Sequence, residues 1–314
     1  MQQYSNPDLD TNYNGTNPLG NVSGWLAVLL GLVLLVGFFL PWADGGSAFD
    51  LVKEEIYGDN WLGKLLSRLI FGSTGLAGLG SLIFGYRLAT SAYREAPFRA
   101  WMATSLGCMV VLGGLFPAML LSTALMADGL GDLQIGMWVT LGGVVLLSIA
   151  ALIGLSGALS EPDYTGSTTV LSSGSGGLAA LLGLVLVVAF FLPWSAESSG
   201  WDLVKEDLGS DSYVGKLLFR LVFGSTALAG IGAMIFGSGR AASTYRSAAY
   251  RAWMTTSLAG MGLLAGFVPS FLWSSALLAD AGGELKIGIW LSSGCAVMLV
   301  VGAVVDLAGQ QAEM

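Results

Sequence analysis

The sequence predicts an all-α integral membrane protein whose eight transmembrane helices form two tandem, parallel four-helix repeats. Three observations lead there: an apolar composition, motifs that recur at one fixed offset, and four membrane-length apolar stretches in each copy. Of the 314 residues, 54% are hydrophobic and only 11% are charged, and the mean hydropathy is +0.72. Soluble domains carry about 25% charged residues. Most of the surface of this protein is therefore expected to face lipid.

The repeat is the strongest signal, because self-similarity at a fixed spacing is the signature of an internal duplication. Four motifs return after 152 residues: Phe-Phe-Leu-Pro-Trp at 38–42 and 190–194, Asp-Leu-Val-Lys-Glu at 50–54 and 202–206, Phe-Gly-Ser-Thr at 71–74 and 223–226, and Arg-Ala-Trp-Met at 99–102 and 251–254. An even number of crossings per copy gives both copies the same orientation. The copies are then related by a pseudo-two-fold axis along the membrane normal.

Each copy has four apolar stretches that reach the about 20 residues needed to cross a bilayer as a helix. We expect spans near 24–42, 65–86, 101–125 and 137–159, and again near 176–194, 217–238, 253–277 and 289–309. The chain then divides into a disordered N-terminal tail (1–23), a first repeat (24–159), a Ser/Gly linker (160–175), a second repeat (176–309) and a C-terminal tail (310–314).

Composition also argues against several classes of function. The chain has no histidine and a formal net charge of −8. It therefore lacks the commonest ligand of zinc and haem, and its acidity gives no reason to bind nucleic acid. Cys108 and Cys295 lie in apolar runs at non-equivalent positions; we expect inert thiols, the alternative being a disulfide or metal pair. We expect no catalytic residue, cofactor or metal.

Charged residues gather after the first span of each copy, which ends at Pro41 or Pro193. This candidate outer-face polar cluster comprises Asp50, Lys53, Glu54, Lys64, Arg68, Asp202, Lys205, Glu206, Lys216 and Arg220. We expect Asp50 and Asp202 to be the N-caps of short amphipathic surface helices. Arg68 is expected one turn inside the membrane boundary, paired with Asp50 or Glu54. The segment is either a lid that seals the bundle or a recognition element, and its cations form either an internal ion pair or an anion or lipid-headgroup site.

Arginine and aromatic residues mark the opposite boundary. The candidate lipid-headgroup anchors are Arg94, Arg99, Trp101, Arg246, Arg251 and Trp253. Such residues hold helices among anionic headgroups, although a docking site for a soluble partner is the alternative. Because these short loops carry arginines and few acids, the positive-inside rule places both termini in the cytoplasm and the protein in the cell membrane.

The second and third spans carry packing signals. Glycines with Ser and Thr in the second span predict close helix contacts, at the core or at the interface between the copies. Pro117 and Pro269 fall inside the third span, where each frees the carbonyl of Gly113 or Ala265. These prolines either hinge a transporter or are static kinks.

The Leu-Pro-Trp helix ending and the later Gly-Trp-Asp-Leu at 200–203 resemble uncharacterised bacterial multispanning proteins over one helix and one loop per copy. The resemblance implies no activity. No charged residue lies near the middle of an expected span, and Asp306 lies near the end of the last one. The sequence therefore favours a non-catalytic scaffold or accessory subunit, whose partners are the bilayer and other membrane subunits or itself. The alternative is a channel or facilitator for a small neutral or weakly charged solute along the pseudo-two-fold axis.

Overall fold

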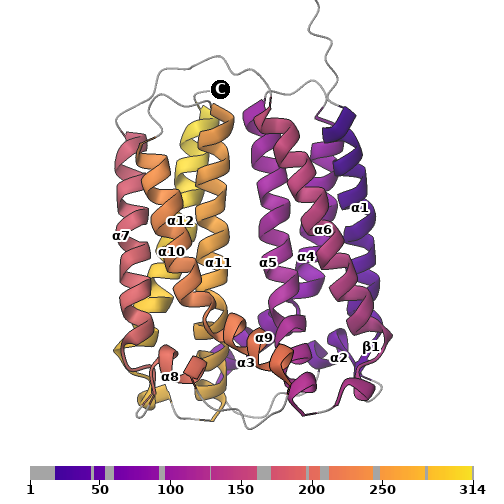
Figure 1. Cartoon of the computed structure of the whole chain (residues 1–314), viewed down its shortest axis with the longest axis vertical. Helices are drawn as coiled ribbons and strands as arrows, with labels where there is room; N and C mark the ends of the chain where they lie inside the picture. The colour runs from indigo at the N-terminus through magenta and orange to yellow at the C-terminus, as the bar shows by residue number, and fades with distance from the viewer. Residues whose placement is uncertain are drawn as a thin grey trace, which may run out of the picture.

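The structure is a computed structural model that describes residues 18–43, 46–53, 60–91, 96–127, 129–160, 171–195, 198–205, 212–242, 248–279 and 282–312. Within these residues it is almost entirely helical; a two-stranded antiparallel sheet pairs β1 (Pro41–Ala43) with β2 (Gly46–Ser47). Long helices stand side by side, and the short helices gather at one end of the molecule, opposite the C-terminus (Figure 1).

The helices fall into two halves with the same order of elements. The N-terminal half contains α1 (Pro18–Phe39), α2 (Ala48–Lys53), α3 (Trp61–Phe71), α4 (Ser73–Ala89), α5 (Ala96–Met126), η2 (Leu130–Asp132) and α6 (Ile135–Leu159). The C-terminal half contains α7 (Leu171–Phe191), α8 (Gly200–Lys205), α9 (Tyr213–Phe223), α10 (Ser225–Ala241), α11 (Ala248–Leu278), η4 (Gly282–Glu284) and α12 (Ile287–Ala312). The bounds of α2 to α5 recur in α8 to α11 at an offset of 152 residues. Residues at this offset are called equivalent below.

Six of the described helices are long and apolar enough to cross a membrane: α1, α5, α6, α7, α11 and α12. The pairs α3–α4 and α9–α10 also pass this test, but each is bent by 56° at a single glycine, Gly72 or Gly224. The protein thus has the architecture of an all-α, multi-pass membrane protein.

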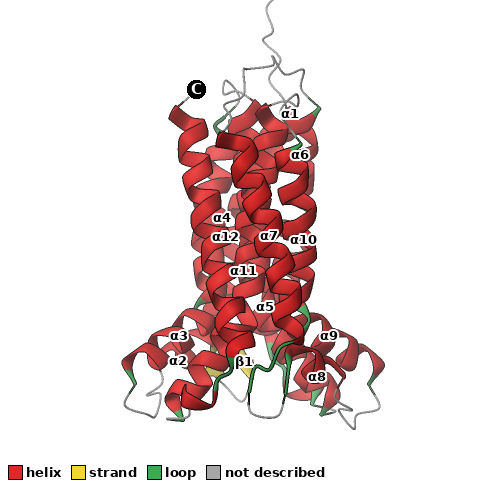
Figure 2. Ribbon diagram, turned by 90° about the vertical axis from the view of Figure 1, so that its left-hand side faces the viewer, coloured by secondary structure: helices red, strands yellow, loops and turns green. Residues whose placement is uncertain are grey.

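The continuous helices predicted over 65–86 and 217–238 are therefore wrong in detail. Only α4 and α10 stand with the long helices, whereas α3 and α9 splay outwards at the end away from the C-terminus (Figure 2). The physical reason is that α3 and α9 are amphipathic. Gly63, Ser67 and Ile70 form the buried stripe of α3, while Lys64 and Arg68 lie elsewhere on the helix and are not buried. A helix with cations on one face is more favourable along a membrane boundary than across the hydrocarbon.

Three helix ends also differ from the predicted boundaries. α1 begins at Pro18, so the last residues of the predicted 1–23 tail are helical. Proline suits the first turn of a helix, where its missing N–H has no intrahelical partner to lose. α7 begins at Leu171, inside the predicted linker, and α12 runs to Ala312, inside the predicted C-terminal tail. Residues 1–17 and 161–170 lie outside the described part of the chain.

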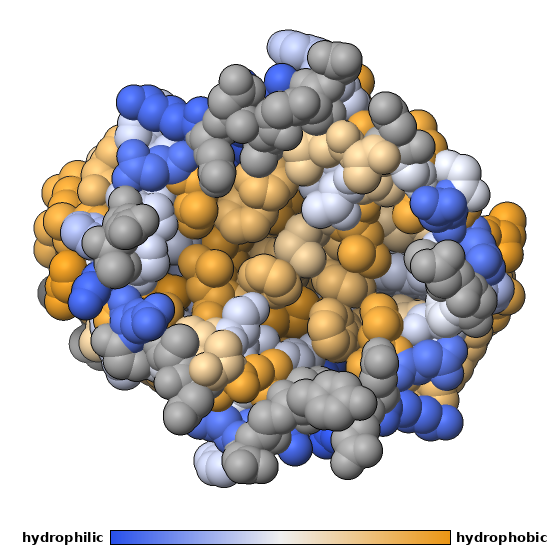
Figure 3. Space-filling view, turned by 90° about the horizontal axis from the view of Figure 1, so that it is seen from below, coloured by the Kyte–Doolittle hydropathy of each residue, from blue (hydrophilic) through white to orange (hydrophobic). Residues whose placement is uncertain are grey.

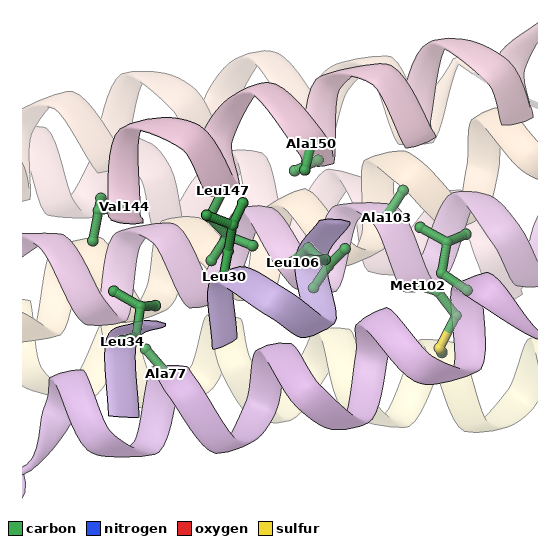
Figure 4. Close-up of a cluster of buried hydrophobic side chains, with 12 residues drawn as sticks. Leu30, Leu34, Ala77, Met102, Ala103, Leu106, Val144, Leu147 and Ala150 are labelled. Atoms are coloured by element: carbon green, nitrogen blue, oxygen red, sulfur yellow. The ribbon is translucent and has the colours of Figure 1, made fainter. Parts of the chain in front are cut away.

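Each half has its own apolar core. In the N-terminal half, Leu30 and Leu34 of α1 meet Leu106 of α5 and Leu147 of α6 (Figure 4). Glycines let α4 approach α1: a Cβ placed on Gly31 would lie 2.9 Å from the carbonyl oxygen of Gly78. The close packing predicted for the glycine-rich helix is therefore present, but it lies within a half.

The contact between the halves is made by α5 and α11 instead. The thiol of Cys108 on α5 lies 3.6 Å from the carbonyl oxygen of Thr256 on α11. The splayed helices add a reciprocal crossing, because α3 packs on α11 while α9 packs on α5. The Ser67 and Ser274 hydroxyls share a buried hydrogen bond of 2.7 Å across this contact. The two halves are thus interlocked along their length.

Candidate functional site

The repeated Phe-Gly-Ser-Thr motif lies at the two helix breaks, beside the proline kinks of α5 and α11. Thr74 donates a hydrogen bond of 3.3 Å to the carbonyl of Gly113, and Thr226 donates one of 3.2 Å to the carbonyl of Ala265. These are the two carbonyls that Pro117 and Pro269 deprive of a helical partner. The motif therefore joins each broken span to a kinked neighbour and satisfies the backbone oxygen that the proline frees.

The serine before each threonine behaves differently in the two halves. Ser225 donates a 3.3 Å hydrogen bond to the carbonyl of Leu264. The equivalent Ser73 is only 3% exposed, and its hydroxyl has no hydrogen-bond partner. A buried hydroxyl without a partner is unfavourable and calls for an explanation.

Ser73 lines an apolar cavity of about 330 Å³ at the seam between the halves. The walls come from α3, α4 and α5 on one side and from α11 and α12 on the other, and they comprise Leu66, Leu69, Ile70, Ser73, Leu112, Gly262, Leu263, Gly266, Phe267, Ser270, Ala296, Val297, Val300 and Val301. No charged residue is among them. Leu69, Val297 and Val301 are also exposed, so the cavity is continuous with the apolar outer surface of the molecule.

Two residues of the cavity wall differ from those at the equivalent positions of the other half. Gly262 and Ala296 line it, whereas the equivalent positions of the N-terminal half hold Val110 and Val144. The two sides of the seam therefore carry side chains of different size at these positions, although the chain repeats its sequence pattern.

The predicted outer-face polar cluster lies at the α3/α9 end. Seen from that end, the molecule is apolar in its centre and hydrophilic around its rim (Figure 3). Lys64 and Lys216 are half-buried, and Arg68 and Arg220 are exposed. Among the described residues, Arg68 has no ion pair with Asp50. Glu54 and Glu206 lie outside the described residues, and the cluster as a binding site stays a prediction.

Asp50 and Asp202 are not N-caps, as the sequence suggested, but occupy the third position of α2 and α8. Ser47 is the N-cap: its amide and hydroxyl donate to the Asp50 carboxylate at 2.8 and 2.6 Å, while its hydroxyl accepts from the Asp50 amide. Ser199 and Asp202 form the same capping box. The Ser47 hydroxyl, followed by its amide, lowers the pKa of the Asp50 carboxyl, and Ser199 does the same for Asp202. Each helix is thus fixed locally.

The cations at the ends of these short helices bind aromatic rings. The Lys53 ammonium lies 4.2 Å from the centre of the Phe49 ring, and the Lys205 ammonium lies 4.8 Å from that of Trp201. Both contacts are within the range of a cation–π interaction. These contacts give Lys53 and Lys205 of the predicted cluster a structural role that requires no ligand.

The tryptophans that end the first span of each copy are core residues. Trp42 is 2% exposed, and its indole N–H donates 2.8 Å to the carbonyl of Gly37; Trp194 makes the same bond to Ala189. Neither indole therefore belongs to an aromatic belt at the membrane boundary, because proline ends the helix and the indole turns back to satisfy a last-turn carbonyl.

The predicted headgroup anchors differ in how deeply the structure buries them. Arg99 is only 6% exposed, so its side chain faces the protein, while Trp101, Arg251 and Trp253 are half-buried. Arg94 and Arg246 lie outside the described residues. Headgroup binding by this set stays a prediction.

Sequence reasoning missed one buried polar network. Arg240 of α10 is 2% exposed and donates to both carboxylate oxygens of Asp306 on α12, each at 3.2 Å. Thr255 of α11 donates 2.9 Å to the same carboxylate. The span expected over 217–238 ends before Arg240, and Asp306 lies near the end of the last expected span. A comparison of the two copies could have indicated the network, because the equivalent positions hold the apolar or small residues Leu88, Ala103 and Gly154.

Both cysteines are free and buried, so they do not form a disulfide. Comparisons of the chain with models of protein families, with curated proteins and with solved structures found no match.

Proposed function

We propose that this protein is a non-catalytic scaffold or accessory subunit of a membrane assembly. In this proposal each bent helix pair is one span, the chain crosses the membrane eight times as two parallel copies, and both termini are cytoplasmic. The observation that carries the proposal is the close packing of α5 on α11 between the halves. A fused, interlocked dimer is suited to holding its shape while it binds others.

Contacts along the seam support a rigid body. Near the termini, Ala96 and Ala100 of α5 cluster with Ala249 and Ala252 of α11, and all four are buried. Midway, Cys108 lies against Thr256. At the other end, a Cβ on Gly63 would lie 3.1 Å from Leu277. Such close-packed small residues are typical of permanent helix contacts in membranes.

One observation favours the second candidate, a facilitator for a small neutral or weakly charged solute. Broken helices in corresponding places of two repeats are found at substrate sites of transporters. A facilitator of that kind works by moving one half against the other.

A disulfide across the seam separates the two candidates. A Cβ on Gly260 would lie 3.2 Å from the Cys108 sulfur, so Gly260→Cys is placed to bridge the halves through the native thiol. We expect the oxidised variant to retain the partners that wild type carries in native mass spectrometry of the complex purified from its own membrane. The control is Gly260→Cys with Cys108→Ser, which cannot form the bridge.

Solute flux into proteoliposomes completes the test. Flux through the wild-type protein that the disulfide abolishes would favour the facilitator. A wild-type protein that purifies alone at every expression level would refute the accessory-subunit proposal.

A further inference from the structure

We propose that the cavity beside Ser73 binds one acyl chain of a membrane phospholipid, with the ester carbonyl of that chain accepting a hydrogen bond from Ser73. A lipid in this cavity is compatible with either function proposed above, because it requires neither a partner protein nor movement of the halves.

The first reason is the position of the cavity. Its wall includes Leu69, Val297 and Val301, which are exposed on the flank of the bundle, so the cavity opens where a lipid tail is the neighbouring molecule. A volume of about 330 Å³ is at the lower end of the range of small-molecule sites. Because no charged residue lines it, the part of the ligand inside must be uncharged.

The second reason is the unpartnered hydroxyl. Ser73 is 97% buried yet donates to nothing, while its equivalent, Ser225, is satisfied by the carbonyl of Leu264. The hydroxyl oxygen itself is enclosed in the empty cavity. In this proposal the Ser73 side chain turns about its Cα–Cβ bond to another staggered rotamer when a ligand brings an acceptor into the cavity, and the hydrogen bond then removes the deficit. Ser270, the second hydroxyl of the wall, lies on the opposite side of the seam.

The third reason is depth. Ser73 is the first residue of the upright helix α4, directly after the break from α3, whose exposed cation Arg68 belongs outside the hydrocarbon. This is the level at which the polar headgroup region of a bilayer meets its hydrocarbon. An ester group of a lipid in the same leaflet lies at that level, and its chain then continues along α11 and α12.

The difference between the halves supports a single site. Gly262 and Ala296 line the cavity, whereas the equivalent positions of the other half hold the larger Val110 and Val144. We therefore expect one specifically retained lipid per chain.

The test measures the retention of phosphatidylcholine by the delipidated full-length chain, with native mass spectrometry used to count bound lipids. The two probes are the ordinary diester lipid and its diether analogue, which has the same chains and headgroup but no ester carbonyl. We expect wild type to retain one diester lipid and to bind the diether about fivefold more weakly, the effect of one neutral hydrogen bond. Ser73→Ala should remove that difference, and Ser225→Ala should preserve it.

A second pair of variants tests the cavity itself. Gly266 lines the wall, and a Cβ placed there would meet only Ala296, at 3.5 Å. Gly266→Leu should therefore fill the cavity and abolish retention, whereas Gly294→Leu, at an exposed site with open space around it, adds the same side chain and should not.

Equal retention of the diester lipid by wild type and Gly266→Leu would overturn the proposal. So would equal affinity of wild type for the two lipids. Loss of a homodimer in Gly266→Leu, without any lipid retention by wild type, would identify a second copy of the chain as the occupant and would also overturn it.

Discussion

The buried network of Arg240, Thr255 and Asp306 allows a prediction whose sign changes between two variants. Arg240→Leu removes one partner and leaves the Asp306 carboxylate, which is 14% exposed, with Thr255 as the one remaining donor of the described network. A triple variant, Arg240→Leu with Thr255→Ala and Asp306→Gly, instead installs the set that the N-terminal half carries as Leu88, Ala103 and Gly154.

The magnitudes follow from the burial of the charges. Breaking a buried ion pair by removing one partner costs about 3–5 kcal/mol, since the remaining charge is neither paired nor hydrated. Replacing the whole network with apolar residues that fit is neutral or stabilising by about 1–4 kcal/mol. The apolar set does fit in its own half, where a Cβ on Gly154 would lie 3.1 Å from Leu88 and 3.3 Å from Ala103. We therefore expect the single variant to be destabilised by about 3 kcal/mol, because Asp306 keeps some exposure, and the triple variant to match wild type or exceed it.

The free energy of unfolding is measured by reversible SDS titration in mixed micelles, followed by circular dichroism. Arg87→Leu is the control: Arg87 is an exposed arginine near the end of α4, and its loss should change stability by less than about 0.5 kcal/mol. A triple variant that is less stable than the single variant would refute the reasoning, because the network would then be favourable beyond the pairing of its charges.

Three further predictions rest on other contacts. Thr226→Val should cost about 1–3 kcal/mol, because the carbonyl freed by Pro269 loses its donor, and Thr226→Ser should restore most of that stability in the same titration. Gly136→Ala should destabilise by about 1–3 kcal/mol, because its Cβ would lie 2.6 Å from the Leu40 carbonyl oxygen, while Gly142→Ala, with open space around it, should be neutral or slightly stabilising. Asp50→Asn should destabilise at neutral pH; since the folded pKa of Asp50 is lowered, the difference from wild type should be full above the unfolded value of about 3.9 and should vanish as the pH falls through the folded pKa. A difference that persists at the lowest pH would contradict this origin.

Features that depend on a single helix could be predicted from the sequence. Apolar stretches of membrane length predicted the long helices, and the proline after each first span predicted where α1 and α7 end. The carbonyls freed by Pro117 and Pro269 also followed from the sequence, because proline lacks the amide that the preceding turn requires.

The hydrogen-bond partners of these carbonyls could not be predicted from the sequence. Thr74 and Gly113 are on different helices, and no periodicity indicates which threonine will reach which carbonyl. The same holds for Trp42, which is amphipathic enough for a membrane boundary and yet is buried in the core. Both outcomes depend on which residues of a neighbouring helix lie opposite: Gly113 accepts from Thr74, and Phe116 stacks on Trp42.

The sequence by itself determined that this protein is helical, apolar and built on a pattern that returns after 152 residues, because composition and period are properties of the chain alone. Only the tertiary structure decided that the second span of each half is bent by 56°, that α3 and α9 cross to the other half, and that Arg240 meets Asp306 in the interior. These features depend on contacts between residues far apart in the chain. Equivalent positions also hold different side chains, such as Gly262 and Val110, and Gly262 is one of the residues that line the cavity beside Ser73.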